Sequence, residues 1–199
     1  MQMSVADTIR TYLRSRPFTL MAIEGGIVNY SALSRTIQEE LKLKSYAAVK
    51  AGVCRYASEV MARREATELR AHLIFEGNTI TLMDGIVVIT SRNRLDLKSE
   101  AEVKFGAYYA YLTDRKSAAR ITKNDRRGIL KVRDSCTAII VHSDERLETT
   151  VGALSLLTAM LAGQNINIIE TISCYTETIF VVDNGDALRS YELLSALTK

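Results

Sequence analysis

Residues 136–183 read CTAIIVHSDERLETTVGALSLLTAMLAGQNINIIETISCYTETIFVVD, and this stretch decides the fold. Its first eight residues, 136–143, are rich in β-branched side chains and predict a strand. The next apolar run, 149–163, is too long for a strand and predicts a helix, for which Thr149 or Thr150 is the expected N-cap.

Two more strands and a helix are predicted further along the chain. Residues 165–173 and 177–183 alternate polar with β-branched residues and are separated by only three residues, which favours two adjacent antiparallel strands. Asp186 is the expected cap of an amphipathic helix over 187–199. The order strand, helix, strand, strand, helix predicts an α+β unit, in which helices cover one face of an antiparallel sheet.

Residues 77–135 are expected to form a middle segment that contributes strands to this sheet. The turn signals Gly77-Asn78 and Asp84-Gly85 lie between β-rich runs, and they predict a hairpin over 76–91. A strand from residues 78–90, or one from another subunit, is expected to cover the sheet edge that residues 136–199 leave open.

The rest of the middle segment predicts one helix and two strands. The helix is expected over 99–115, because Ser99 can cap it and acidic residues follow in its first turn. The strands are expected over 118–122 and 128–133, and the loop between them could also join them as a hairpin.

Residues 1–76 predict a helical domain. The expected caps are Ser4 for the first helix, Asn29 or Ser31 for the third and Ser45 for the fourth, and Pro17 can open the second. Short helices followed by a longer basic helix fit a helix-turn-helix plan, and the predicted hairpin after them would make this domain winged-helix-like.

Charge is distributed unevenly along the chain. Residues 1–135 hold 23 Lys and Arg against 15 Asp and Glu, whereas residues 136–199 hold 3 against 8. A basic part of this kind can face nucleic acid, although the two oppositely charged parts can also attract each other or a partner subunit.

Two groups of basic residues are candidates for binding double-stranded DNA. The helix expected over 45–69 carries the first group, and the loop between the two strands of the middle segment carries the second. The alternatives are a solvated helix surface for the first group and a docking site for the acidic part of the chain for the second. The candidate residues are Lys50, Arg55, Arg63, Arg64, Arg126 and Arg127.

The sequence contains no arrangement of residues that is typical of an enzyme. His72 and His142 lie outside any nucleophile, metal or phosphate-loop motif, so we expect neither catalysis nor a cofactor or metal. His142 is expected to be a hydrogen-bonded structural residue. The three cysteines are far apart in sequence and no apolar run approaches the ~20 residues of a membrane span, which favours a cytoplasmic protein.

Several marks in residues 136–199 together resemble an ACT domain, particularly those of aspartokinase regulatory regions. These marks are Gly152 at the start of the first helix, the NINI run at 165–168, the polar strand end at Thr171 and Ser173, and the hydrophobic strand IFVVD. The whole chain resembles archaeal proteins described as predicted regulators of amino-acid metabolism, in which a helical domain precedes an ACT domain.

The resemblance implies a ferredoxin-like fold, a homodimer or higher homo-oligomer, and an amino-acid effector held near the start of the first helix and of the second strand. A helix N-terminus suits a carboxylate because its N–H groups are unpaired and its dipole is positive there. We expect these amides to lie beside the second strand, so that Thr150 and Asn167 meet. The ligand residues implied by position are Glu148, Thr149, Thr150, Val151, Gly152, Asn165, Ile166 and Asn167.

These observations lead to two hypotheses about function. The first is a transcription regulator that binds DNA through residues 1–76 and an amino acid at an ACT domain over 136–199. The alternative is a regulatory or scaffold subunit of an enzyme of amino-acid metabolism that binds no DNA, with the ACT domain used for dimerisation. An ACT-like dimerisation module without ligand also remains open.

Overall fold

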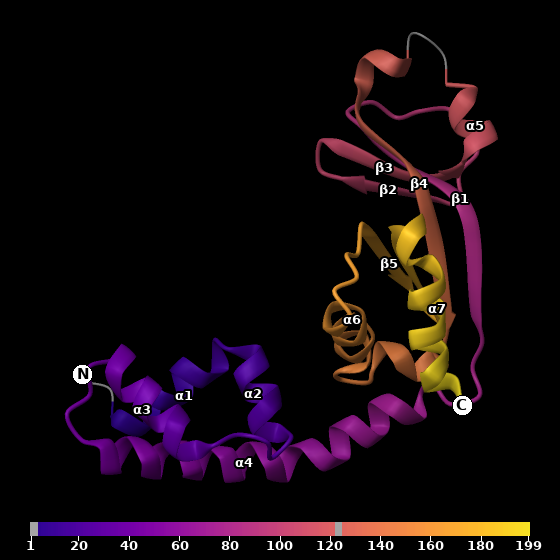
Figure 1. The fold of residues 1–199 in the computed structure, drawn as a ribbon. Helices are drawn as coiled ribbons and strands as arrows, with labels where there is room; N and C mark the ends of the chain where they lie inside the picture. Colours follow the sequence, from indigo (N-terminus) through magenta and orange to yellow (C-terminus); the bar gives the residue numbers. More distant parts are fainter. Residues whose placement is uncertain (1–3, 122–124) are drawn as a thin grey trace. The chain divides into compact units, whose positions relative to one another are not determined.

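The chain divides into two compact units, Met1–Leu69 and Arg70–Lys199. The computed structural model describes residues 4–121 and 125–199, apart from the side chains of residues 63–72 (Figure 1). The first unit is helical, and the second contains a six-stranded antiparallel sheet with helices. The α+β class expected from the sequence is therefore confirmed.

Four helices make the first unit, and the caps predicted from the sequence begin three of them. Ser4, Asn29 and Ser45 accept hydrogen bonds from backbone N–H groups two or three residues further on. Pro17 is the first residue of the second helix, where its missing N–H costs no hydrogen bond. The helices are α1 (Val5–Arg14), α2 (Pro17–Glu24), α3 (Tyr30–Glu40) and α4 (Tyr46–Leu73).

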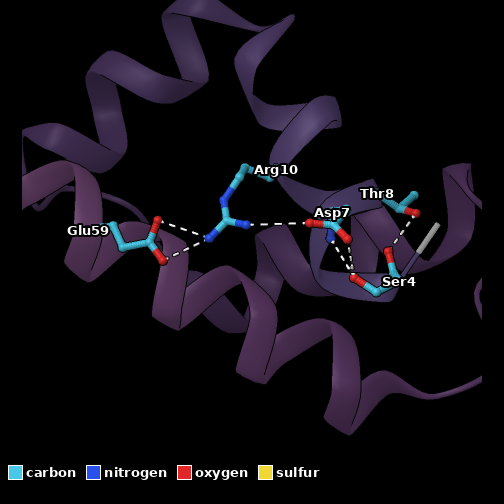
Figure 2. A network of polar contacts seen from close by, with 5 residues as sticks. All are labelled: Ser4, Asp7, Thr8, Arg10 and Glu59. Carbon is cyan, nitrogen blue, oxygen red and sulfur yellow. Dashed lines mark hydrogen bonds and ion pairs between the residues drawn. The ribbon is translucent and has the colours of Figure 1, made fainter.

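A polar network joins α1 to α4 beside the buried core of this unit (Figure 2). Arg10 donates to both carboxylate oxygens of Glu59, at 2.9 and 3.1 Å, and lies 3.5 Å from Asp7. Asp7 in turn accepts a hydrogen bond from Ser4. The apolar side of the contact includes Ile9 and Val53, both fully buried.

The expected wing is not formed, because residues 80–91 make one continuous strand, β1 (Ile80–Ser91), within the sheet of the second unit. Asp84 and Gly85 produce a bulge in this strand, where the register shifts between Met83 and Ile86 and Gly85 adopts a φ of 72°. Asp84-Gly85 does interrupt the regular strand, as a turn signal predicts. Because the residues on both sides of it pair with β4, the interruption is a bulge and not a hairpin turn.

The sheet order is β2-β3-β1-β4-β6-β5, and all pairs are antiparallel. β1 lies beside β4, so the prediction that a strand from 78–90 covers this edge is confirmed. The chain end lies at the start of β1, since the Gly77 N–H donates to the Thr198 carbonyl at 3.1 Å. The remaining strands are β2 (Ala101–Phe105), β3 (Tyr108–Asp114), β4 (Ile129–His142), β5 (Glu170–Cys174) and β6 (Glu177–Asp183).

The prediction of a helix over 99–115 is wrong. These residues form the hairpin of β2 and β3, which turns at Gly106 and Ala107, and Gly106 has a φ of 54°. A glycine at the first position of a two-residue loop is a hairpin signal. Tyr111 and Leu112 are both buried but belong to different clusters, one on each face of the sheet. Burial of both faces removed the polar alternation that would have marked a strand.

Two other predictions in the middle segment are also corrected. Residues 115–119 form a short helix, α5 (Arg115–Ala119), instead of part of a strand over 118–122, of which Thr122 lies outside the described residues. The strands predicted over 128–133 and 136–143 are a single strand, β4, which follows a 3-10 turn, η1 (Asp125–Gly128).

Two helices cover one face of the sheet, as the sequence predicted. These are α6 (Ala153–Gly163) and α7 (Ala187–Ser195), which pack Leu157 and Leu194 against Phe180 of β6 and Ile139 of β4. On the other face the sheet curls, so that Ala101 of β2 and Ile172 of β5 join the same apolar cluster although they come from the two edge strands (Figure 1).

We expect replacement of Asp114 by Ala to destabilise the second unit in a pH-dependent manner. The Asp114 carboxylate caps α5 by accepting hydrogen bonds from the Ser117 hydroxyl and from the N–H groups of Lys116 and Ser117. The Ser117 hydroxyl in particular lowers the pKa of Asp114 below its ordinary value of 3.8. Because the folded-state pKa is the lower one, this stabilisation is present above 3.8 and disappears as pH falls through the folded value.

Urea unfolding of the native chain and the Asp114→Ala variant tests this prediction. The difference in the free energy of unfolding should be constant near neutral pH and shrink below 3.8. A difference that grows on acidification would contradict it.

Candidate functional site

The loop that follows β4 is held by its own polar groups. It begins with a 3-10 turn, η2 (Glu145–Glu148), capped by Asp144, whose carboxylate accepts from the N–H and the Nε of Arg146, both at 2.8 Å. The Arg146 guanidinium lowers the pKa of Asp144, and Asp144 raises that of Arg146. The Arg146 carbonyl accepts from Thr149 and Thr150 at 3.1 and 3.0 Å, which fixes the chain as it enters α6.

The N-terminus of α6 has no side-chain cap. Gly152, rather than Thr149 or Thr150, is the N-cap residue, and its φ of 90° lies in a region that residues with a Cβ rarely adopt. In the first turn the Ala153 N–H makes only a long bond of 3.4 Å, to the Thr150 carbonyl. Within the described part of the chain, the N–H groups of Leu154 and Ser155 have no hydrogen-bond acceptor. They are therefore free to bind an anionic group.

A hollow of about 460 Å³ opens beside this helix end. One wall is the loop and the first turn of α6, and the other is the turn between β5 and β6. Tyr175 lies in that turn with a φ of 53°, and its hydroxyl donates to Glu145 at 3.1 Å, so the two walls are linked. The hollow is lined by Leu147, Glu148, Thr150, Gly152, Leu154, Ser155, Ser173, Cys174 and Tyr175.

The lining groups differ in chemistry in a way that suits a small zwitterion. Glu148 supplies an exposed carboxylate, and Thr150, Ser155 and Ser173 supply hydroxyl groups. Leu147 and Leu154 supply apolar surface, and the described residues that line the hollow include no lysine, arginine or histidine. The positive potential there comes from the end of the α6 dipole.

The structure brings together only part of the ligand set predicted from the sequence. Glu148, Thr150 and Gly152 line the hollow. Thr149 and Val151 lie in the same loop but outside the lining, and the Val151 side chain is 79% exposed.

The other predicted ligand residues, 165–167, lie at the opposite end of α6. Eleven helical residues separate them from Gly152, a rise of about 16 Å. Asn165 has a φ of 57°, and its N–H and that of Ile166 donate to Ala162 and Leu161, which satisfies the last carbonyls of the helix. The expectation that Thr150 and Asn167 meet within one chain is therefore not met.

Strand direction explains this separation. β6 runs antiparallel to β4 and begins where β4 ends, since Glu177 pairs with His142. The turn before β6 must then lie beside the loop after β4, while β5 starts at the far end. Four residues that line the hollow were not predicted as ligand residues: Ser155, Ser173, Cys174 and Tyr175. The short connection at 174–176 together with this pairing rule would have indicated the last three.

The candidate DNA-binding residues are divided between the two units. Lys50 and Arg55 are exposed on α4, and Arg126 and Arg127 are exposed in η1. The side chains of Arg63 and Arg64 lie outside the described residues.

His142 is hydrogen-bonded, as predicted. Its Nε2 lies 3.0 Å from the Thr81 hydroxyl, and its Nδ1 lies 3.3 Å from a Glu177 carboxylate oxygen. Among the residues that the structure describes, no group of His, Cys, Asp and Glu could hold a metal ion. None of the described helices is long and apolar enough to cross a membrane.

Comparison with solved structures relates the fold to aspartate kinases. The aspartate kinase of Clostridium acetobutylicum matches 60% of this chain with a TM-score of 0.52 and 11% identity. Escherichia coli aspartokinase III in complex with aspartate and ADP matches 60% with 0.50 and 13%. The regulatory subunit of aspartate kinase from Thermus thermophilus, in its ligand-free form, matches 62% with 0.51 and 10%. The similarity is one of fold, and this fold is ACT-like.

The extent of these matches differs between the relatives. The similarity spans 34% and 33% of the two kinases, but 100% of the T. thermophilus regulatory subunit. No family model matches the sequence, and no curated protein matches it. At these identities the similarity concerns the fold.

Proposed function

We propose that this chain is an amino-acid-responsive regulatory protein whose effector binds in the hollow at the start of α6. The observation that carries this proposal is the uncapped helix end, which lies beside the carboxylate of Glu148 in a hollow of about 460 Å³. This volume is in the range of sites for small molecules. The regulatory subunit of T. thermophilus, with the same fold, supports a regulatory rather than a catalytic role.

The proposed binding mode assigns each part of an amino acid to a part of the hollow. The α-carboxylate accepts hydrogen bonds from the free N–H groups of Leu154 and Ser155. The α-ammonium group interacts with Glu148, and the side chain lies against Leu147. Since none of the described residues that line the hollow is cationic, a zwitterion suits it better than a dianion.

A homodimer would explain why the predicted ligand residues lie at two ends of α6. This helix is apolar around most of its circumference, yet Leu154 is 43% exposed. A second copy packed antiparallel along α6 would cover this surface and bring its residues 165–167 to the hollow. We propose this two-fold arrangement as the complete site.

In this proposal, the effector changes the arrangement of the two protomers. This rearrangement changes the activity of a partner enzyme of amino-acid metabolism. The effector must bind one arrangement more tightly than the other, because an effector with equal affinity shifts neither. The alternative in which the first unit binds DNA has less support, since its expected wing is a strand of the sheet unit. DNA binding stays a prediction, and its affinity should fall steeply with salt.

Thermal-shift measurements with the twenty amino acids test the effector. An amino acid at 100 times its dissociation constant should stabilise the protein by about 2.7 kcal/mol. The Glu148→Gln variant should lose most of this stabilisation, whereas Glu192→Gln, on the exposed side of α7, should retain it. If no amino acid stabilises the native chain, the domain is a ligand-free dimerisation module and the proposal is wrong.

Mixed dimers test whether the site lies between two protomers. Neither Glu148→Gln nor Asn167→Ala homodimers should bind the effector well. If the site is shared, a dimer with one copy of each variant contains one site without either substitution, so mixing them should restore binding to one site per dimer. If the mixed dimer forms but does not bind the effector, the whole site lies within one chain.

A further inference from the structure

The two halves of β4 have different neighbours. From Cys136 to His142 the strand pairs with β6 on one side and with β1 on the other. From Ile129 to Ser135, β1 is its only partner among the described strands. Ser135, with a φ of 58°, marks the change, and the register with β1 shifts at the same place. β4 therefore bends here and leaves its first half at an open edge of the sheet (Figure 1).

This edge presents backbone groups that lack a partner strand. In a strand, alternate residues direct their N–H and C=O groups to opposite neighbours, so about half of those in 129–135 point away from β1. A weak bond of 3.8 Å from the Cys136 thiol to the Arg133 carbonyl lies at the bend. Within the described residues, no other hydrogen bond reaches these backbone groups except those of the pairing with β1.

A mostly apolar hollow of about 380 Å³ lies against the same half of β4. It is lined by Ile89 of β1, Ala118 of α5, Ile121, Arg126 of η1, and Ile129 and Val132 of β4. Val132 is 54% exposed and Leu130 is 47% exposed, which is unusual for large apolar residues on a strand without a neighbour.

The edge carries more cations than anions, since Lys131 and Arg133 lie within it against Asp134. Lys131 and Arg133 alternate with Val132 and thus lie on the opposite face of the strand, and Arg126 and Arg127 are exposed in the preceding turn. None of these four cations makes an ion pair with another residue in the described ranges.

The charges decide which partner fits. Two copies of this edge paired about a two-fold axis at Val132 would set Lys131 of each copy opposite Arg133 of the other, and like charges in that position are destabilising. A nucleic acid would satisfy the cations but not the apolar hollow or the backbone edge. An extended acidic peptide satisfies all three.

We propose that residues 129–135 of β4 bind an extended segment of a partner protein, which adds to the sheet as a further strand. Directly opposite residues of paired strands share a face, so the segment carries an apolar residue opposite Val132 and acidic residues opposite Lys131 and Arg133. The recognised pattern is acidic, apolar, acidic. This edge lies at the other half of β4 from the hollow at α6, so it does not depend on the proposed effector.

A fluorescein-labelled seven-residue peptide of alternating glutamate and valine serves as the probe, with fluorescence anisotropy as the readout. It should bind the full-length chain, and the double variant Lys131→Glu, Arg133→Glu should weaken binding at least about tenfold. Both positions are exposed, so the variant should fold normally, as circular dichroism can verify. Lys104→Glu, on the edge strand at the other side of the sheet, should bind like the native chain.

Backbone pairing is tested separately from charge. The same peptide with N-methylated amides keeps its charges but loses its donors, and it should bind roughly tenfold or more weakly. Hydrogen exchange should slow at residues 129–135 when the unmodified peptide is bound. Equal binding of the methylated peptide, loss of binding in Lys104→Glu, or displacement of the peptide by a short DNA duplex at equal charge concentration would each overturn the proposal.

Discussion

Replacement of Phe180 by Ala is expected to destabilise the sheet unit by about 3–5 kcal/mol. Phe180 lies in β6 and is fully buried, where it packs among residues from β4, α6 and α7. Truncation removes apolar burial and leaves a cavity that neighbours on three elements cannot fill without moving. Urea unfolding followed by far-ultraviolet circular dichroism measures the loss.

A second aromatic residue of the same sheet provides the control. Phe105, at the end of β2, is 62% exposed, so Phe105→Ala should change the free energy of unfolding by no more than roughly 0.5 kcal/mol. Equal effects of the two substitutions would mean that the helices do not pack on this face of the sheet.

The second large effect is expected from Gly152→Val. A branched side chain at a φ of 90° costs on the order of 1–3 kcal/mol, and the first turn of α6 can relieve this strain only by moving. Movement would misplace the N–H groups of Leu154 and Ser155, on which the proposed carboxylate site depends. We expect effector affinity to fall at least about a hundredfold, as isothermal titration calorimetry can measure.

The Gly106→Val variant is the control for Gly152→Val, because it introduces backbone strain at a position outside the proposed site. Gly106 also has a positive φ, of 54°, and a Cβ there would meet no atom within 4 Å. It lies in the turn between β2 and β3, away from the residues that line the hollow. This variant should be destabilised but should bind the effector normally. If Gly152→Val also binds normally, the effector does not use the start of α6.

The resemblance to ACT domains identified part of the candidate site, but not how its parts are arranged. Glu148, Thr150 and Gly152 were predicted by their position in that resemblance, and they line one hollow. Ser173 and Tyr175 come from more than twenty residues away and reach the same hollow through the antiparallel pairing of β4 with β6. Asn167 was grouped with them by resemblance, yet α6 holds it at the other end.

By itself, the sequence determined the helices of the first unit and the order of elements after residue 136. These signals act within a few residues, so they can be recognised without knowledge of the fold. They are capping residues such as Ser4 and Asn29, and the change in hydrophobic periodicity between α6 and its flanking strands. Only the tertiary structure decided that residues 80–91 form one strand rather than a hairpin, and that 101–114 form a hairpin rather than a helix. Their conformation depends on distant partners, since Val88 and Leu112 gain their burial only when the sheet is assembled.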